Sequence, residues 1–526
     1  MFKNFVILLL IFAATLAIYL ITEDTPNNKL ERLREDYTVK EISSIDHSKL
    51  EVLQQDFTDP RQVTAACISC HTERHTEFMQ TAHWNWEREE YIEGRGIVKI
   101  GKKNNINNFC IGIAGSEGLC NKCHAGYGWS DKNFDFNDSL NVDCLVCHDN
   151  SGTYEKANGL AGLPKPSVDL GHVARNVGKP LKENCGSCHF MSGGGNNVKH
   201  GDLDIALLST TKDVDVHMAV DGLDMECVAC HTAENHKMKG KLYSVSSMNK
   251  DRMECEACHS DMPHEKSIIN EHSIKVACQT CHIPEYAKVN STKMHWDWSE
   301  ACQSTDPNYH VSDSLGNHIY LAKKGRFVWQ RNVTPEYVWF NGTADHYLMG
   351  DKIDTTQQPI DINTLNGSYA DRNSKIIPVK IHRTRQPYDP EYMWLLQPKL
   401  WDADSGNGAL WVDCKTTPIK DMWGIASEKG MEYIGLPYSG KHDFVNTRMY
   451  WPINHMVSPK ENALDCKSCH VREGGRLDEI RDFYMPGRDY NGFIQTAGIW
   501  VIVLSVLGVF SHAAGRIFMS YRKNRK

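Results

Sequence analysis

The stretch CIGIAGSEGLCNKCHAGYGWSDKNFDFNDSLNVDCLVCH, residues 110–148, contains the pattern Cys-x-x-Cys-His twice. The same pattern occurs eight times in this chain of 526 residues. The copies occupy residues 67–71, 120–124, 144–148, 185–189, 227–231, 255–259, 278–282 and 466–470. With 19 cysteines and 25 histidines in the chain, chance alone would give far less than one copy. The repeated pattern therefore has a chemical cause.

Two thiols three positions apart can each bond to one vinyl group of a single porphyrin, and the following imidazole then lies beneath the iron. The pattern predicts eight covalently bound haem c groups, one for each motif. The thioether bonds would be made by Cys67, Cys70, Cys120, Cys123, Cys144, Cys147, Cys185, Cys188, Cys227, Cys230, Cys255, Cys258, Cys278, Cys281, Cys466 and Cys469. The proximal iron ligands would be His71, His124, His148, His189, His231, His259, His282 and His470. A disulfide framework would not place a histidine after every second cysteine, and zinc ribbons do not need that histidine.

Seven motifs lie within residues 67–282, which is too little polypeptide to enclose seven macrocycles in an ordinary core. We therefore expect a multihaem cytochrome c fold whose core is stacked haems, mainly α-helical with extensive irregular structure. Residues 283–465 contain no motif and are rich in Trp and Tyr, and their prolines and Asn-Gly turns predict loops, some strand and short helices. The eighth site follows at residues 466–470.

Both ends of the chain are apolar. Residues 1–22 are typical of a signal sequence or an uncleaved membrane anchor, and no small-residue cleavage site follows them. Residues 494–515 are long enough to cross a bilayer, and residues 516–526 form a basic tail that favours a cytoplasmic C-terminus. This orientation predicts an octahaem domain, residues 23–493, on the periplasmic face of the membrane, with a quinol or another cytochrome as electron partner.

The net charge of −8 and the scattered Lys and Arg residues exclude a nucleic acid partner, because no basic stripe is present to follow phosphates.

Low-spin electron-transfer haems usually need a second strong ligand, and the histidines outside the motifs supply candidates. Those near the motifs are His75, His83, His172, His200, His217, His236, His264, His272, His295, His442 and His455. The pool is large enough to give most haems two imidazoles. A haem with both axial positions filled by histidine leaves no room for substrate, so a catalytic haem needs a different or open coordination.

The residues 193–202, GGGNNVKHGD, are the most unusual stretch for such a site. Glycine lets the backbone approach a haem face closely, and Lys199 and His200 follow the glycines. Our hypothesis is that Lys199 ligates one iron, that of the second motif with its His124, while His200 serves another haem or the distal pocket. Lys156 is the alternative lysine. Either amine must be neutral to donate its lone pair, which requires burial.

Three cysteines lie outside the motifs. Cys302 and Cys414 are candidates for a disulfide in an oxidising compartment, which leaves Cys110 as a thiol near the second motif or as an inert buried residue.

The segments NNFCIGIAGSEGLCNKCHAGYGW, NVDCLVCHDNSGTYEK and NCGSCHF followed by GGGNNVKHGDLD, with the isolated last motif, resemble the octahaem tetrathionate reductase family. The resemblance covers residues 67–470. That family is similar in haem arrangement to hydroxylamine oxidoreductases and to the pentahaem nitrite reductases. Nitrite reductases use a Cys-x-x-Cys-Lys motif, which this chain lacks.

The resemblance implies a relay of bis-histidine haems and one active-site haem with a lysine ligand from outside the motif. Lys199 best matches that lysine, and His124, Cys110, His200 and Asp202 complete the candidate catalytic set. The implied activity is reduction of a small sulfur or nitrogen species such as tetrathionate, nitrite or hydroxylamine. The alternatives are a non-catalytic electron conduit attached to the membrane and a centre for hydroxylamine oxidation.

Overall fold

The computed structural model describes residues 45–240, 247–304, 306–414 and 421–524. The chain divides into two compact units, Met1–Ala463 and Leu464–Lys526, which are described separately. The predicted signal or anchor, residues 1–22, lies outside the described residues.

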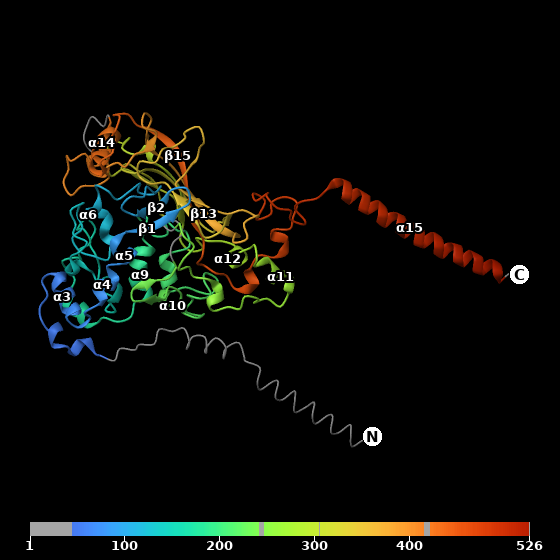
Figure 1. The fold of residues 1–526 in the computed structure, drawn as a ribbon, viewed down its shortest axis with the longest axis horizontal. Helices are drawn as coiled ribbons and strands as arrows, with labels where there is room; N and C mark the ends of the chain where they lie inside the picture. Colours follow the sequence, from blue (N-terminus) through green and yellow to red (C-terminus); the bar gives the residue numbers. More distant parts are fainter. Residues whose placement is uncertain (1–44, 241–246, 305, 415–420, 525–526) are drawn as a thin grey trace, which may run out of the picture. The chain divides into compact units, whose positions relative to one another are not determined.

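The haem motifs of the first unit lie on or beside short helices, several of which gather in one half of this unit (Figure 1). A helical turn suits the motif because residues three apart face the same side of a helix. The helices are η1 (His47–Lys49), η2 (Glu51–Leu53), α3 (Pro60–Cys70), α4 (Arg74–Phe78), α5 (Ala82–Asn85), α6 (Glu117–Cys120), η3 (Asn121–Cys123), η4 (Ser139–Asn141), α7 (Leu145–His148), α8 (Leu170–Arg175), α9 (Lys182–His189), η5 (Ile205–Leu208), α10 (Cys227–Cys230), η7 (Cys255–Ala257), α11 (Ser267–His272), α12 (Cys278–His282), η8 (Trp298–Glu300), α13 (Leu410–Asp413), α14 (Met422–Ile434) and η9 (Lys460–Asn462).

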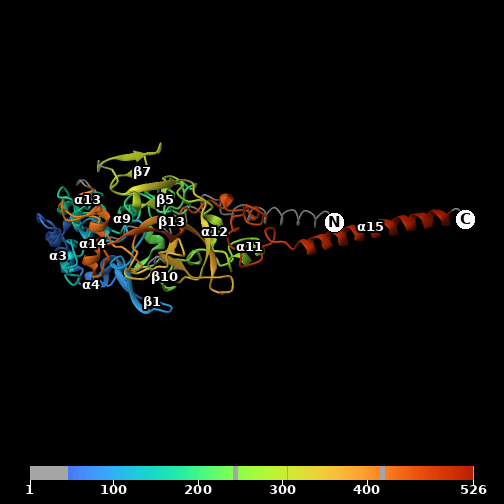
Figure 2. The same cartoon turned by 90° about the horizontal axis from the view of Figure 1, so that it is seen from above.

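Most strands of the first unit come from the motif-free part of the chain. The strands are β1 (Glu87–Ile92), β2 (Gly96–Gly101), β3 (Ala233–Glu234), β4 (Lys237–Met238), β5 (Thr292–Asp297), β6 (His310–Ser312), β7 (His318–Leu321), β8 (Gly325–Gln330), β9 (Glu336–Phe340), β10 (Ala344–His346), β11 (Ile360–Asp361), β12 (Asn363–Leu365), β13 (Lys375–Asp389), β14 (Trp394–Leu395) and β15 (Asp443–Pro452). Nine of them form one sheet in the order β11-β15-β13-β5-β8-β7-β6, with β9 and β14 also paired to β13. The hairpin of β6 and β7 projects from the edge of this sheet (Figure 2).

The central strand β13 is buried on both faces. Val379 and Ile381 pack on one face in a cluster with Ala277 and Phe340. The other face carries buried polar side chains: Lys380, His382, Thr384 and Gln386. This polar face positions the site, because it binds two loops from the motif-rich half.

Both loops are held by hydrogen bonds to β13. The Lys380 amine donates to the carbonyls of Val198, at 2.6 Å, and Lys199, at 3.1 Å. The Thr384 hydroxyl donates to the carbonyl of Asn108 at 2.7 Å. The sheet therefore fixes the segments that carry Lys199 and Cys110.

The expectation of a mainly α fold is not confirmed, since helix accounts for 29% and strand for 19% of the part of the chain that the structure describes. The physical reason is the long pairing of β13 with β15, whose β-branched and aromatic residues fit a half-buried pleated surface. The expected extensive irregular structure is present between these elements.

The second unit contains the eighth motif, on η10 (Cys466–Ser468), and the long helix α15 (Gly492–Lys523). Helix α15 has 32 residues and a mean hydropathy of 2.1 in its most apolar window, and its side chains are exposed. By length and composition it is able to cross a bilayer, as expected for residues 494–515.

Candidate haem centres and active site

Histidine rings face one another at six of the motifs. The ring centres are 6.0–6.5 Å apart in the pairs His71 with His47, His148 with His236, His189 with His83, His231 with His455, His259 with His217, and His282 with His264. Two imidazoles bound to opposite sides of one metal, each with a metal–nitrogen bond of about 2 Å, would have ring centres about 6 Å apart. The residues present therefore fit a bis-histidine haem at each of these six motifs.

Cysteines from different motifs also lie beside one another. The neighbouring pairs are Cys67 with Cys144, Cys123 with Cys188, Cys185 with Cys227, Cys230 with Cys258, and Cys255 with Cys278. These contacts join the first motif to the third, and they connect the second, fourth, fifth, sixth and seventh in that order. The arrangement brings the attachment sites close enough for a relay.

The second motif is not among the six with facing histidines, because the rings around its histidine are tryptophans and phenylalanines. The His124 ring is enclosed by Trp84, Trp86 and Trp129, with ring centres 4.9–5.5 Å away. Its Nε2 is 2.7 Å from the carbonyl oxygen of Trp84. Burial lowers the pKa of His124 to about 3, so the ring is neutral. This cage holds the nitrogen that would normally bind iron.

The amine of Lys199 lies near the same motif. It contacts the Trp451 ring, 4.5 Å from the ring centre, and interacts electrostatically with Cys123. Burial, reinforced by the charge of Lys102, lowers the pKa of Lys199 to about 7. Within the described residues, no hydrogen bond or ion pair of this amine is present. Lys199 is thus a buried amine with its lone pair available near neutral pH.

The alternative lysine, Lys156, has a different environment. Its amine forms an ion pair with Asp143 at 3.0 Å and donates to the carbonyls of His124, at 2.5 Å, and Gly126, at 3.1 Å. Both side chains of the pair are almost fully buried, 3% and 0% exposed. An amine that makes three such interactions has no lone pair to offer a metal, so the geometry favours Lys199.

Further lysines surround the free thiol of Cys110. Lys102, Lys293 and Lys324 all act electrostatically on this thiol, and burial raises its pKa. The amine of Lys293 lies over the rings of Trp296 and Phe327, at 3.9 and 3.7 Å, and that of Lys324 over Trp411 at 4.5 Å. The Cys110 thiol also interacts electrostatically with Cys120 of the second motif, and burial together with this interaction raises the pKa of Cys120. Burial lowers the pKa of Lys293 well below its usual value, so the cations beside this motif are Lys102 and Lys324.

Comparison with known proteins decides the family. The model for the family described as bacterial cytochrome c matches residues 293–473. A crystal structure of an octahaem cytochrome c from Shewanella oneidensis is 42% identical in sequence, with a TM-score of 0.77. The match covers 85% of this chain and 99% of that one. This chain belongs to the octahaem c-type cytochromes. An uncharacterised protein of Archaeoglobus fulgidus is 24% identical over 248 residues, 38% of this chain and 82% of its own length.

Membership confirms that the octahaem cytochrome carries covalently bound haem c, as the eight motifs predict. It also confirms the resemblance noted from the sequence at the level of the octahaem c-type cytochromes.

Sequence reasoning missed His47 as a partner for the first motif. His47 is the only histidine ahead of that motif, and this position was the available signal. Of the candidates from sequence, His83, His217, His236, His264 and His455 each face a motif histidine.

Other candidate histidines lie elsewhere in the octahaem cytochrome. His172 is exposed on α8, His295 is paired with Arg383 in the sheet, and His442 faces Asp421 at 3.6 Å. The structure does not bring these three rings to a motif histidine. His272 lies on α11, with Nδ1 2.6 Å from the carbonyl oxygen of Ile268. In the second unit, Nδ1 of His470, the histidine of the eighth motif, is 2.7 Å from the carbonyl oxygen of Pro486. His75 lies on α4 beside Thr76.

The side chains of His200 and Asp202, which lie on the same loop, contact different parts of the structure. The His200 ring packs edge-on against Trp451, 5.1 Å between centres, on the residue that Lys199 also contacts. Asp202 accepts hydrogen bonds from the backbone and ring of His455. His200 therefore shares the surroundings of Lys199, whereas Asp202 contacts a proposed ligand of the fifth motif.

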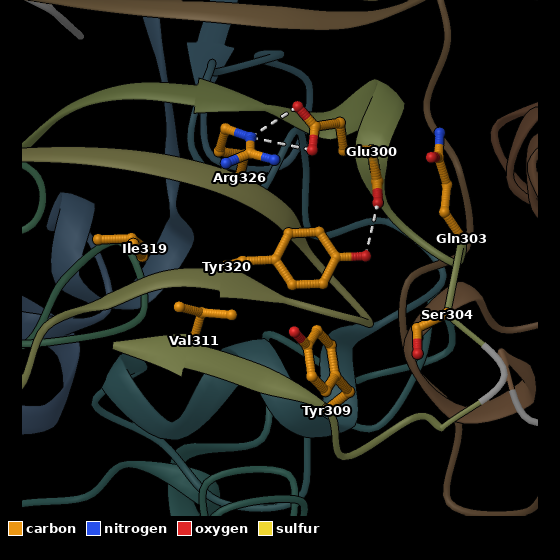
Figure 3. A pocket seen from close by; sticks show the side chains of 8 residues that line it. All are labelled: Glu300, Gln303, Ser304, Tyr309, Val311, Ile319, Tyr320 and Arg326. Carbon is orange, nitrogen blue, oxygen red and sulfur yellow. Dashed lines mark hydrogen bonds and ion pairs between the residues drawn. The ribbon is translucent and has the colours of Figure 1, made fainter. Parts of the chain in front are cut away.

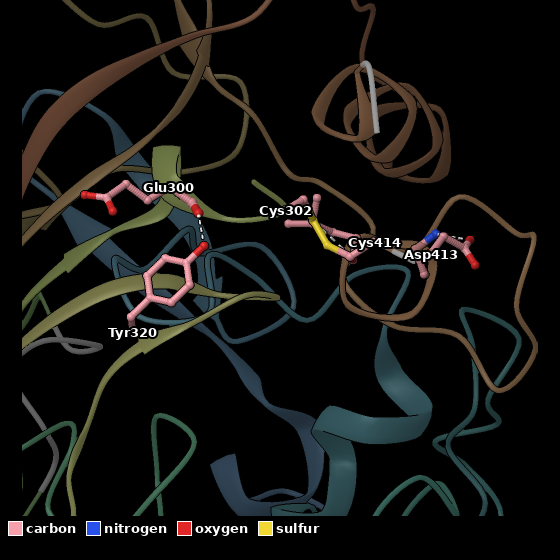
Figure 4. The surroundings of a disulfide bond; sticks show 7 residues. Glu300, Cys302, Tyr320, Asp413 and Cys414 are labelled. Atoms are coloured by element: carbon pink, nitrogen blue, oxygen red, sulfur yellow. Dashed lines mark hydrogen bonds between the residues drawn. A yellow bond between two sulfur atoms is a disulfide. The ribbon is translucent and has the colours of Figure 1, made fainter. Parts of the chain in front are cut away.

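The predicted disulfide between Cys302 and Cys414 is confirmed. It joins Cys302, two residues after η8, to Cys414, directly after α13, with Cα atoms 5.2 Å apart (Figure 4). Cys110 remains a free thiol, as expected from the odd number.

A surface pocket of about 300 Å³ lies along β7 and β8 (Figure 3). Its cation, Arg326, donates to both carboxylate oxygens of Glu300, at 2.8 and 3.0 Å. The pocket contains no motif residue and its charge is neutralised, so it is a poor site for an anionic substrate.

Proposed function

We propose that this octahaem cytochrome is a reductase for a small sulfur or nitrogen species, and that Lys199 ligates the active-site haem of the second motif. The observation that carries the proposal is that His124, the histidine of the motif, is hydrogen-bonded elsewhere, while Lys199, from outside the motif, lies near the same motif. The caged ring of His124 hydrogen-bonds to Trp84, while the buried amine of Lys199 lies by Cys123 without a hydrogen-bond acceptor in the described residues.

The haem, when bound, supplies electrons from the relay and a Lewis-acidic iron. Lys199 would hold this haem, and a small substrate would have access to its iron, since no second histidine faces this motif within the described part of the chain. The six motifs with two facing rings suit electron transfer.

The loop that presents Lys199 is rigidly supported. Gly193 and Gly194 adopt left-handed conformations, with φ of 83° and 95°, that let the chain turn sharply behind α9. Lys380 then fixes the carbonyls of Val198 and Lys199, which lie directly before and after the Lys199 side chain along the backbone. The amine is therefore preorganised rather than recruited from a flexible surface loop.

The cations beside the second motif favour an oxyanion. Lys102 and Lys324 both act on the thiol of Cys110, and the Lys324 amine lies 4.0 Å from the position that a Cβ on Gly194 would take. No carboxylate pairs with either amine in the described residues. Tetrathionate and nitrite carry the charge that such a site attracts, whereas hydroxylamine is neutral at pH 7.

The proposed location is the periplasmic face of the cytoplasmic membrane, with α15 as the anchor and a quinol or membrane-bound cytochrome as donor. Two features support it: the apolar length of α15 and the basic residues after residue 515. The disulfide fits an oxidising compartment.

The test is a steady-state assay with tetrathionate, nitrite and hydroxylamine and a viologen donor, combined with electron paramagnetic resonance of each variant. Lys199→Leu should abolish turnover and alter the signal of one haem. The matched control is Lys122→Leu, which removes a lysine inside the second motif and should leave both readouts unchanged.

An unaltered set of eight haem signals in Lys199→Leu would reject the lysine ligand. Absence of turnover with all three substrates, in either direction, together with eight six-coordinate irons, would make the protein an electron conduit.

A further inference from the structure

The ring nitrogens of the paired histidines have different hydrogen-bond partners. Nδ1 of His148 is 2.8 Å from the carbonyl oxygen of Gly178, and Nδ1 of His231 is 3.0 Å from that of Lys239. Nδ1 of His264 is 3.1 Å from the side-chain amide oxygen of Asn270. These three partners are neutral. Nδ1 of His236 lies 3.2 Å from a carboxylate oxygen of Glu77, but Arg74 forms an ion pair with that carboxylate at 2.7 Å. Nδ1 of His455, which faces His231, lies 3.1 Å from a carboxylate oxygen of Asp202.

Asp202 is buried and its contacts converge on His455. One carboxylate oxygen accepts the backbone N–H groups of Asn454, at 2.7 Å, and His455, at 2.9 Å, as well as the ring contact. The side chain is 2% exposed. The second carboxylate oxygen is buried without a hydrogen-bond partner among the described residues. The charge is therefore poorly screened by water.

No cation in the described structure forms an ion pair with Asp202 other than the ring of His455 itself. Lys380 interacts with it electrostatically, but the Lys380 amine donates to Val198, Lys199 and the Thr292 hydroxyl, the last at 2.6 Å. The ring of His455 thus receives the field of a nearly uncompensated carboxylate.

We propose that Asp202 is a positioning residue that fixes the ring of His455 and lowers the reduction potential of the haem at the fifth motif. A carboxylate bonded to the far nitrogen of an imidazole makes the ligating nitrogen more basic, which favours the ferric over the ferrous iron. The low-dielectric surroundings strengthen this effect. The inference rests on the proposed pairing of His231 with His455 as haem ligands and adds that Asp202 sets the reduction potential of that haem.

In the series of neighbouring cysteine pairs, the fifth motif lies between the fourth and the sixth. The reduction potential of its haem therefore controls the passage of electrons along this part of the relay. A low potential there makes transfer into the fifth haem the uphill step and transfer out of it the downhill step.

Asp215 provides a matched control. Its side chain is also buried, 3% exposed, and it also holds the segment around His455, accepting the N–H groups of Met456, at 2.7 Å, and Val457, at 3.2 Å. Its nearest ring is that of His217, whose Nδ1 is 3.7 Å away, too far for a hydrogen bond. Replacing Asp215 removes a comparable charge without removing a ring hydrogen bond.

The test is potentiometric titration of the holoprotein followed by electron paramagnetic resonance. Asp202→Asn retains an oxygen for the same N–H groups and removes the charge. We expect it to raise the midpoint of one bis-histidine haem by about 59 mV, which corresponds to a tenfold change in a one-electron equilibrium. Asp215→Asn should shift that haem by clearly less. His455→Met identifies the component that belongs to the fifth motif.

The inference is overturned if Asp202→Asn leaves that component in place, or if Asp215→Asn shifts it equally. If His455→Met changes no bis-histidine component, the ligand pairing itself fails, which is a separate result. Should Asp202→Asn assemble poorly, Asp202→Ser, which retains a hydroxyl acceptor, must show the same upward shift.

Discussion

Replacing Lys156 with methionine should destabilise the protein without changing the coordination of any haem. The amine forms an ion pair with Asp143 at 3.0 Å, and both side chains are almost completely buried. Removing one partner of a buried pair costs about 3–5 kcal/mol, because the remaining charge has no counterion. Two carbonyls, of His124 and Gly126, lose their donor as well.

Asp143 would keep part of its support in this variant. The hydroxyls of Tyr127 and Tyr154 donate to it at 2.9 and 2.8 Å, as does the N–H of Val146 at 3.0 Å. We therefore expect a loss near the lower end of that range, about 3 kcal/mol. Adding Asp143→Asn to Lys156→Met should recover part of the loss, since the unpaired charge is then absent.

The assay is denaturant unfolding followed by tryptophan fluorescence and the Soret band, with resonance spectra recorded on the folded protein. The reasoning is refuted if Lys156→Met retains full stability and instead changes one haem signal. That outcome would make Lys156 the ligand and leave Lys199 with a structural role.

Three further predictions follow from single features. His47→Leu should convert one low-spin haem to a high-spin five-coordinate form, detected by resonance spectroscopy, because His47 faces His71; an unchanged low-spin count would reject the pair. Lys324→Gln should raise KM for nitrite or tetrathionate several-fold and leave KM for hydroxylamine unchanged; equal effects on charged and neutral substrates would contradict the electrostatic role. Replacing both Cys302 and Cys414 with Ser should lower the free energy of unfolding by about 5 kcal/mol, the chain-entropy value for a sequence separation of 112, and an unchanged denaturation midpoint would contradict it.

The haem attachment sites are predictable from sequence because they depend on local chemistry. Two cysteines and a histidine within five residues, such as Cys120 to His124, specify a thioether-bonded haem without any tertiary contact. The disulfide could also be predicted from the sequence, because Cys302 and Cys414 remain once the motif cysteines are assigned and Cys110 lies far from them in sequence.

The pairing of ligands is a long-range property. Facing rings such as His231 and His455 are separated by more than 200 positions, and only the folded chain brings them together. The candidate pool was informative, yet the choice of His455 over the exposed His172 depends on how residues 452–458 return to the motif-rich half.

The unusual position of His124 was also beyond sequence reasoning. It depends on Trp84, Trp86 and Trp129 enclosing the ring, and these tryptophans come from either side of the second motif. The sheet was underestimated for a similar reason: β13 pairs with both β5 and β15, and Lys380 and Thr384 on its polar face resemble surface residues in the sequence.

One iron of eight, at the second motif, would have Lys199 as a ligand and an exchangeable position for substrate. Titration of the oxidised protein with cyanide or nitrite, with integrated resonance spectra, measures this directly. We predict that one haem in eight changes its signal and that the change is lost in Lys199→Leu. Eight unaltered six-coordinate haems at saturating ligand would contradict the account.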